Sequence, residues 1–187
     1  MNKKEIRKHH LKIRQEMSPT NVKDKSILIN DRILNLLSDY NLAKSIGLFY
    51  PYKNEVDVIL MALELEKRGL VCLLPKVINE HNPLKYFFYS PNSSNLEKGY
   101  GGIMEPTGNE TKDPDIIIAS CSAFNEKGYR VGYGGGFFDR TLSQLKHKKK
   151  IISILAAFEN QKTTYQFQDS YDEKVDYICT ENNTYQT

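Results

Sequence analysis

Apolar positions recur at helical spacing near the start of the chain. One side of a predicted N-terminal helix consists of Ile6, Ile13 and Met17. Ser18 and Pro19 follow, and this pair is typical of a helix start, because serine caps the first turn and proline fits within it. The sequence therefore predicts a second helix, whose apolar side consists of Val22, Ile29, Ile33, Leu36 and Leu37.

After residue 40, short apolar runs alternate with helical stretches. We predict strands at 45–50, 71–74, 84–89, 116–119, 151–156 and 177–180. Helices are predicted at about 57–68, closed by Gly69, and at about 137–146, while the Ser-, Asn- and Gly-rich segment 90–102 is expected to be a loop. Strands that are apolar on both faces and alternate with helices are typical of parallel sheets. The predicted fold is therefore α/β, a single domain over residues 1–187 with a central, largely parallel sheet flanked by helices.

The composition limits the classes of function. The chain has 187 residues, of which 40% are hydrophobic, and this is enough for one substantial core. A formal charge of +3 is too small to indicate nucleic-acid binding, and the three cysteines lie far apart without a Cys-x-x-Cys pair. No segment approaches the roughly 20 apolar residues that span a bilayer. We expect a soluble, cytoplasmic monomer that binds small molecules and neither nucleic acid nor membranes.

The most informative segment runs from Arg130 to Arg140 and reads RVGYGGGFFDR. Its glycines remove side chains that would keep a phosphate away from backbone N–H groups, and a helix that begins near Gly136 would add partial positive charge there. The loop matches neither the phosphate loop with Gly-Lys-Ser/Thr nor the dinucleotide fingerprint. It could also be a tight turn that lets a strand approach a helix. The two arginines favour the phosphate interpretation, although Arg140 could equally be a solvated surface group.

Three carboxylates are candidates for chemistry. Asp139 directly follows the glycine loop, where it could help to hold a magnesium ion or could simply favour the helix dipole. Asp172 is a weaker candidate, because acids in surface loops are usually solvated. Glu55 lies between a predicted strand and a predicted helix, where it could face a substrate together with Tyr50, or could belong to an ordinary first turn capped by Asn54.

Several short motifs, taken in order, resemble the 5-formyltetrahydrofolate cyclo-ligase family over nearly the whole chain. They are Lys3-Lys4-x-x-Arg7, Tyr50-Pro51, Glu55-Val56-Asp57, Leu74-Pro75-Lys76, Glu105-Pro106, Asp113-Pro114-Asp115 and the run from Gly128 to Arg140. The resemblance implies an ATP-dependent, magnesium-requiring ring closure that converts 5-formyltetrahydrofolate to 5,10-methenyltetrahydrofolate, with release of ADP and phosphate.

The resemblance also implies roles for residues of this chain. Contacts with ATP are expected from Lys3, Lys4, Glu5, Ile6, Arg7, Arg130, Val131, Gly132, Tyr133, Gly134, Gly135, Gly136, Phe137 and Phe138. Asp139 and Asp172 would coordinate Mg²⁺, and Tyr50 and Glu55 would contact the folate. Some family members carry a basic residue inside the glycine loop, and here Lys76 or Arg140 is expected to supply that charge.

Two other functions remain open from the sequence. The first is an enzyme of similar α/β architecture that acts on a sugar phosphate or a coenzyme A ester, because a fold does not determine a function. The second is a non-catalytic nucleotide or nucleic-acid binding module that uses the basic N-terminus and the lysine-rich run 146–150. ATP dependence and salt-dependent oligonucleotide binding would separate the three.

Overall fold

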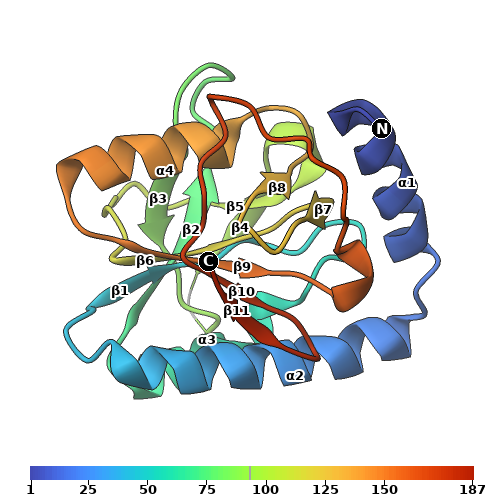
Figure 1. Ribbon diagram of the computed structural model, residues 1–187. Coiled ribbons are helices and arrows are strands. Elements are labelled where there is room, and N and C mark those ends of the chain that lie inside the picture. Colours follow the sequence, from blue (N-terminus) through green and yellow to red (C-terminus); the bar gives the residue numbers. More distant parts are fainter. Residues whose placement is uncertain (93) are drawn as a thin grey trace.

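The computed structural model describes residues 1–92 and 94–187, and these fold around one seven-stranded sheet (Figure 1). In spatial order its strands are β11 (Thr184–Gln186), β10 (Tyr177–Cys179), β9 (Ile152–Ala156), β6 (Ile116–Ala119), β1 (Ser45–Gly47), β2 (Val71–Lys76) and β3 (Lys85–Phe88). The strands from β10 to β2 run parallel, and the edge strands β11 and β3 pair antiparallel with their neighbours. The prediction of a largely parallel α/β sheet is confirmed.

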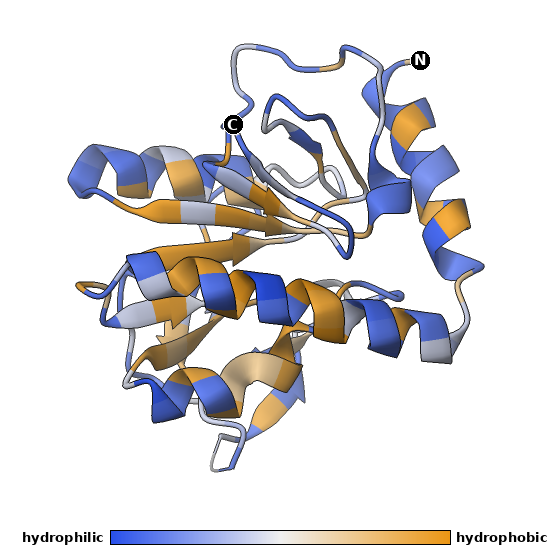
Figure 2. Cartoon of the chain, turned by 60° about the horizontal axis from the view of Figure 1, so that its bottom comes forward, coloured by the Kyte–Doolittle hydropathy of each residue, from blue (hydrophilic) through white to orange (hydrophobic). Residues whose placement is uncertain are grey.

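Helices cover both faces of the sheet, as Figure 2 shows. Helices α2 (Pro19–Leu36) and α3 (Ala62–Lys67) pack on one face, and α4 (Phe137–Lys148) packs on the other. Successive side chains of a strand point to opposite faces, so Ile116 and Ile118 of β6 join the first core while Ile117 and Ala119 join the second. This is why β6 is apolar at every position.

The helix boundaries follow local sequence signals. The Ser18 side chain accepts a hydrogen bond from the backbone N–H of Asn21 at 3.2 Å, with Pro19 as the first residue of α2. Gly69 has a φ of +79° just after α3, and Gly136 has a φ of +65° directly before α4. These positive angles suit glycine and let the chain turn sharply at the helix ends.

Several predicted elements differ from the observed ones. The segment 90–102 is only partly a loop, because it contains β4 (Leu96–Lys98), which pairs with β5 (Met104–Pro106), and the 3-10 turn Tyr100–Gly102; Ser93 lies outside the described residues. The predicted strand at 45–50 ends at Gly47, and the helix predicted at 57–68 begins as a 3-10 turn, Val58–Met61. A second small hairpin joins β7 (Ala123–Phe124) and β8 (Arg130–Val131). Such short strands carry too few residues for a periodic pattern.

Helix α1 (Lys3–Gln15) packs beside the β7–β8 hairpin rather than on the main sheet. Its buried residues are Ile6, His10 and Arg14, whereas Ile13 is only half-buried, so the predicted apolar face was partly wrong. Ile6 meets the hairpin because it packs against Ala123, Val131 and Phe167. Within the described ranges, no helix is both long enough and apolar enough to cross a membrane.

Candidate active site

A cavity of about 370 Å³ opens beyond the carboxyl ends of β1, β2 and β6. Its walls come from the segments that follow these three strands, from the β4–β5 hairpin and from residues 130–139. Most of the lining is aromatic or aliphatic, with the carboxylates of Glu55, Glu105 and Asp139 and the guanidinium of Arg130 as the charged groups. The site therefore lies at the edge of the sheet where α/β proteins usually bind their ligands.

The glycine loop connects β8 to the N-terminus of α4 and forms part of the cavity wall. Gly134 and Gly136 have φ angles of +109° and +65°, which a residue with a side chain rarely adopts. A Cβ atom at Gly135 would lie 2.6 Å from the ring of Phe137. Residues 135–139, which include the first turn of α4, line the cavity, and no side chain of the described residues caps this turn. The backbone N–H groups at the start of a helix are suited to an anion.

Of the residues predicted from the N-terminal motif, Arg7 is the one that the structure brings to the glycine loop. Its Nε atom donates a hydrogen bond of 2.6 Å to the carbonyl oxygen of Gly132. Glu5 instead accepts a hydrogen bond from the backbone of Asn2 in a capping box, and Lys4 is exposed. The Ile6 side chain is fully buried together with Val131, so these two side chains belong to the core.

The buried Arg130 pairs with the half-buried Asp139, which lies just after the glycine loop. The Arg130 Nη2 atom lies 3.1 Å from Asp139 Oδ1, and Nη1 donates to the carbonyl oxygen of Glu173. The same Asp139 oxygen accepts the backbone N–H of Glu173 at 3.1 Å. Arg130 also lies over the ring of Phe138, 5.6 Å from its centroid. The arginine therefore fixes the orientation of the Asp139 carboxylate at the start of α4.

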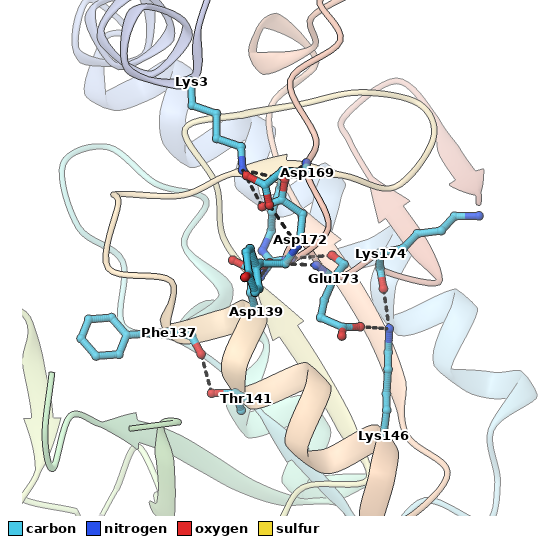
Figure 3. Close-up of polar contacts among 11 residues, drawn as sticks. Lys3, Phe137, Asp139, Thr141, Lys146, Asp169, Asp172, Glu173 and Lys174 are labelled. Carbon is cyan, nitrogen blue, oxygen red and sulfur yellow. Dashed lines mark hydrogen bonds and ion pairs between the residues drawn. The ribbon is translucent and has the colours of Figure 1, made fainter. Parts of the chain in front are cut away.

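Asp172 lies in a loop that the fold places next to Asp139 (Figure 3). Its carboxylate pairs with Lys3 at 2.7 Å, and Lys3 also reaches Asp169 at 2.8 Å. Partial burial alone would lower the pKa of Lys3, but the bonds to Asp169 and Asp172 outweigh it and raise that pKa. The structure thus brings together Lys3, Asp139 and Asp172, which are far apart in the sequence. The partners of the Lys3 ammonium are the carboxylates of Asp169 and Asp172.

Glu55 is buried at the end of a tight turn that follows β1. Lys53 and Asn54 adopt left-handed backbone angles in this turn, and Glu55 Oε2 accepts the backbone N–H of Tyr52 at 3.0 Å. The other oxygen, Oε1, has no hydrogen-bond partner within the described chain. Burial raises the pKa of the Glu55 carboxyl, and the charge of Arg14 opposes this shift without cancelling it. Glu55 lines the cavity together with Tyr50, and its Oε1 atom lies 3.9 Å from Arg14 Nη1.

The alternative interpretation of Glu55 as a first-turn residue capped by Asn54 was wrong. Asn54 donates its side-chain N–H groups to carbonyl oxygens at the end of α1, including that of Arg14 at 3.3 Å. Asp57 is the cap instead, since its side chain accepts the backbone N–H of Ile59. These hydrogen bonds attach the turn at 52–55 to α1, whereas a helix cap would involve only residues of its own segment.

Lys76 and Arg140 do not lie among the described residues that line the cavity. The Lys76 ammonium pairs with Glu97 of β4 at 3.1 Å. Arg140 donates to the backbone carbonyl oxygens of Glu80 and Asn82, and its guanidinium lies over the Phe137 ring. Lys76 thus pairs within the neighbouring hairpin. Arg140 holds the loop at 80–82 and also lies beside the glycine loop, because a Cβ atom at Gly136 would be 2.8 Å from its Nη1 atom.

Two features of the site had no signal strong enough to predict them. Arg14 on α1 is 1% exposed and contacts both the turn at 52–55 and Tyr133 of the glycine loop. The β4–β5 hairpin places Tyr100 and Glu105 in the wall, and Tyr100 packs edge-on against Phe137. Glu105-Pro106 is one of the sequence motifs, but its position over the cavity follows only from the fold.

Comparisons with known proteins point to one family. A family model described as "5-formyltetrahydrofolate cyclo-ligase family" matches residues 1–181. A 5-formyltetrahydrofolate cyclo-ligase from Mycoplasma pneumoniae is 27% identical over 179 residues, which cover 95% of this chain and 98% of that protein. An Escherichia coli protein of the same name is 31% identical over 116 residues, 58% of this chain and 62% of its own.

Solved structures show the same likeness. A 5,10-methenyltetrahydrofolate synthetase from Aquifex aeolicus superposes with a TM-score of 0.81 at 30% identity, covering 100% of this chain and 93% of that one. A synthetase of the same kind from Mycoplasma pneumoniae gives a TM-score of 0.77 at 25% identity, covering 97% and 99%. The family match spans the glycine loop, Glu55 and the carboxylates at 139 and 172, and the chain belongs to the 5-formyltetrahydrofolate cyclo-ligase family of ligase enzymes.

Proposed function

We propose that the protein catalyses the ATP-dependent cyclisation of 5-formyltetrahydrofolate to 5,10-methenyltetrahydrofolate, with release of ADP and phosphate. The observation that carries this proposal is a single cavity that combines two kinds of wall. One is a glycine loop at the N-terminus of α4, suited to phosphates, and the other is aromatic, with the buried carboxylate of Glu55. A reaction between a nucleotide and a flat heterocycle needs both.

The chemistry requires an activated formyl oxygen, because oxide is a poor leaving group from carbon. The formyl oxygen attacks the γ-phosphorus of ATP and ADP departs. The second folate nitrogen then attacks the formyl carbon, and as the ring closes phosphate leaves and takes up the proton of that nitrogen. The protein's part is to align the reacting atoms and to neutralise charge on the phosphates. Arg7, Arg130 and the backbone N–H groups at the start of α4 are positioned for the second task.

Glu55 would orient the folate. Its Oε1 atom accepts no hydrogen bond within the described chain, although Arg14 Nη1 lies 3.9 Å away. It can accept one from the amino group or ring N–H of a pterin, which presents donors along one edge. Tyr50 and the other aromatic side chains of the wall provide flat surfaces on which a heterocycle can pack. A ligand that satisfies Oε1 also removes the free-energy cost of a buried oxygen without a partner.

The residues present fit a magnesium ion that accompanies ATP, with one adjustment. Mg²⁺ is commonly held by one or two carboxylates together with phosphate oxygens, and the described residues contain no cluster of three potential metal ligands that would hold it alone. Asp139 uses Oδ1 for its contacts with Arg130 and Glu173, so Oδ2 can serve as a ligand. Asp172 would have to exchange its pairing with Lys3 for the metal. A bound Mg²⁺ would neutralise charge on the transferring phosphoryl group.

The test is a spectrophotometric assay with the purified protein, 5-formyltetrahydrofolate, ATP and magnesium. The methenyl product is conjugated and absorbs in the near ultraviolet, so we expect absorbance to rise only when all three additions are present. Omission of each component is the control. A folded protein that gives no rise, or a rise without ATP, would refute the proposal and would favour an α/β enzyme that uses another substrate.

A further inference from the structure

We propose that Arg14 is a positioning residue that couples the folate-binding turn to the glycine loop, so that filling one half of the site prepares the other. The inference rests on the proposed function for the identity of the two ligands. Its structural basis is one buried guanidinium, 1% exposed, that contacts both halves of the cavity wall at once.

The contacts of Arg14 come from three separate segments. Its Nε atom donates to the carbonyl oxygen of Lys53 at 3.0 Å, and Nη1 donates to that of Cys121, just beyond β6, at 2.8 Å. The Nη2 atom donates to the Tyr133 hydroxyl, and Arg14 also lies over the Tyr133 ring, 5.7 Å from its centroid. The carboxylate of Glu55 lies 3.9 Å from Nη1.

This arrangement links the positions of its acceptors. A guanidinium is planar, and its N–H groups point in fixed directions, so a shift of one acceptor must rotate the group or leave a buried N–H without a partner. The carbonyl of Lys53 precedes Glu55 by two residues, and Tyr133 lies inside the glycine loop. A folate that settles against Glu55 therefore restrains Tyr133 through Arg14, and nucleotide binding restrains Glu55 in the same way.

The same helix provides a matched control. Arg7 also contacts the glycine loop, through Gly132, but the contacts recorded for it within the described chain do not reach the turn at 52–55. Replacement of Arg7 should therefore weaken nucleotide binding without uncoupling the two halves. Arg14→Lys keeps the positive charge near Glu55 but loses the fork that joins the three segments. Tyr133→Phe removes only the hydroxyl, in case Arg14→Lys does not fold.

The first arm measures binding by calorimetry with a non-hydrolysable ATP analogue and magnesium, with and without saturating 5-formyltetrahydrofolate. For the unaltered protein we expect the folate to tighten analogue binding by about fivefold or more. In Arg14→Lys and in Tyr133→Phe this ratio should fall to within about twofold of one, whereas Arg7→Lys should weaken the analogue and keep the ratio. A folded Arg14→Lys variant that retains the full ratio, or a ratio of one in the unaltered protein, would overturn the inference.

The second arm needs no ligand, so it is independent of the proposed function. The backbone N–H of Glu55 donates to Tyr52, and that of Tyr52 donates to Glu55 Oε2, so both should be protected from hydrogen exchange. Arg14→Lys should accelerate their exchange by about tenfold or more, while Arg7→Lys leaves it unchanged. If the unaltered protein binds neither ligand, the proposed function fails, and the exchange measurement alone tests the role of Arg14. Unchanged exchange in Arg14→Lys would then overturn the inference.

Discussion

Asp139 is held from two sides, and this makes its substitution informative. Asparagine has the same shape and can still accept the hydrogen bonds from Arg130 and from the Glu173 backbone, but it lacks the charge that a metal requires. We expect Asp139→Asn to lower turnover by about 100-fold or more. The loss of stability should be only about 1–3 kcal/mol, because the buried Arg130 loses its counter-charge but keeps its bond. Turnover and thermal unfolding of the same preparation check this, and near-normal turnover in a folded variant would exclude the metal role.

Substitution of Glu55 should affect the KM for 5-formyltetrahydrofolate more than the KM for ATP. Glu55→Gln removes the charge that the pterin edge would meet, while the glycine loop keeps its own contacts. We expect the KM for 5-formyltetrahydrofolate to rise by about tenfold or more and the KM for ATP to change far less at saturating folate. Initial rates over a grid of both substrates measure this. Equal changes in the two KM values would contradict the folate assignment.

The same residue should make stability depend on pH. Because burial raises the pKa of Glu55 in the folded state, the folded protein holds this proton at pH values where the unfolded chain has released it. The contribution of Glu55 to stability is therefore fully present below the usual carboxyl pKa, and it is lost as the pH rises through the folded-state value. In denaturant unfolding at a series of pH values, stability should fall with rising pH more steeply for the unaltered protein than for Glu55→Gln. Parallel curves would show that the pKa of the Glu55 carboxyl is not raised in the folded protein.

The β4–β5 hairpin forms a wall of the cavity because Glu105 ties it to β2. The Glu105 carboxylate accepts the backbone N–H of Val77 at 3.1 Å and that of Tyr100 at 3.3 Å. A Cβ atom at Gly99 would lie 2.1 Å from this carboxylate, so a side chain there would have to displace it from its hydrogen bonds. We expect Gly99→Ala to cost about 1–3 kcal/mol of stability and to raise the KM for folate, because the wall moves.

A nearby glycine provides the control for this prediction. At Gly108 a Cβ atom would have no neighbour within 4 Å, and the backbone angle there is not the left-handed one. Gly108→Ala should therefore stay within about 0.5 kcal/mol of the unaltered protein and keep its kinetics. Denaturant unfolding and initial rates of the two variants side by side are the measurement. Equal effects of both substitutions would show that Glu105 does not hold the hairpin.

The whole molecule should respond to its ligands, because the cavity wall is assembled from segments between residues 49 and 139, braced by α1 and by the loop at 169–173. A ligand at about 100 times its dissociation constant adds about 2.7 kcal/mol of stability. For a chain of this size that corresponds to a rise in melting temperature of about 5–10 °C. We expect such a rise with an ATP analogue and magnesium, and its loss on chelation of the metal. A rise that survives chelation would mean that the nucleotide binds without Mg²⁺.

The local sequence was sufficient for the elements and for the loop that receives phosphate. Hydrophobic periodicity, Ser18-Pro19 and Gly69 act over a few residues, so α2, β6, β9 and the end of α3 could be predicted closely. The glycine loop could be recognised for the same reason, since its conformation depends on the glycines themselves. Short strands such as β4 and β7 escaped because they exist only through their partners.

Tertiary structure decided which charged groups meet. Arg14 has the same local pattern as any surface arginine of an amphipathic helix, and only the docking of α1 buries it among carbonyl groups of the 52–55 turn and of Cys121. Lys3 and Asp172 are separated by 169 positions, and their pairing depends on where the loop at 169–173 crosses α4. Lys76 or Arg140 was expected to supply charge to the phosphates, and in the fold Lys76 pairs with Glu97 while Arg140 donates to the carbonyl oxygen of Glu80. Contacts between distant segments depend on the path of the whole chain, and periodicity carries no information about that path.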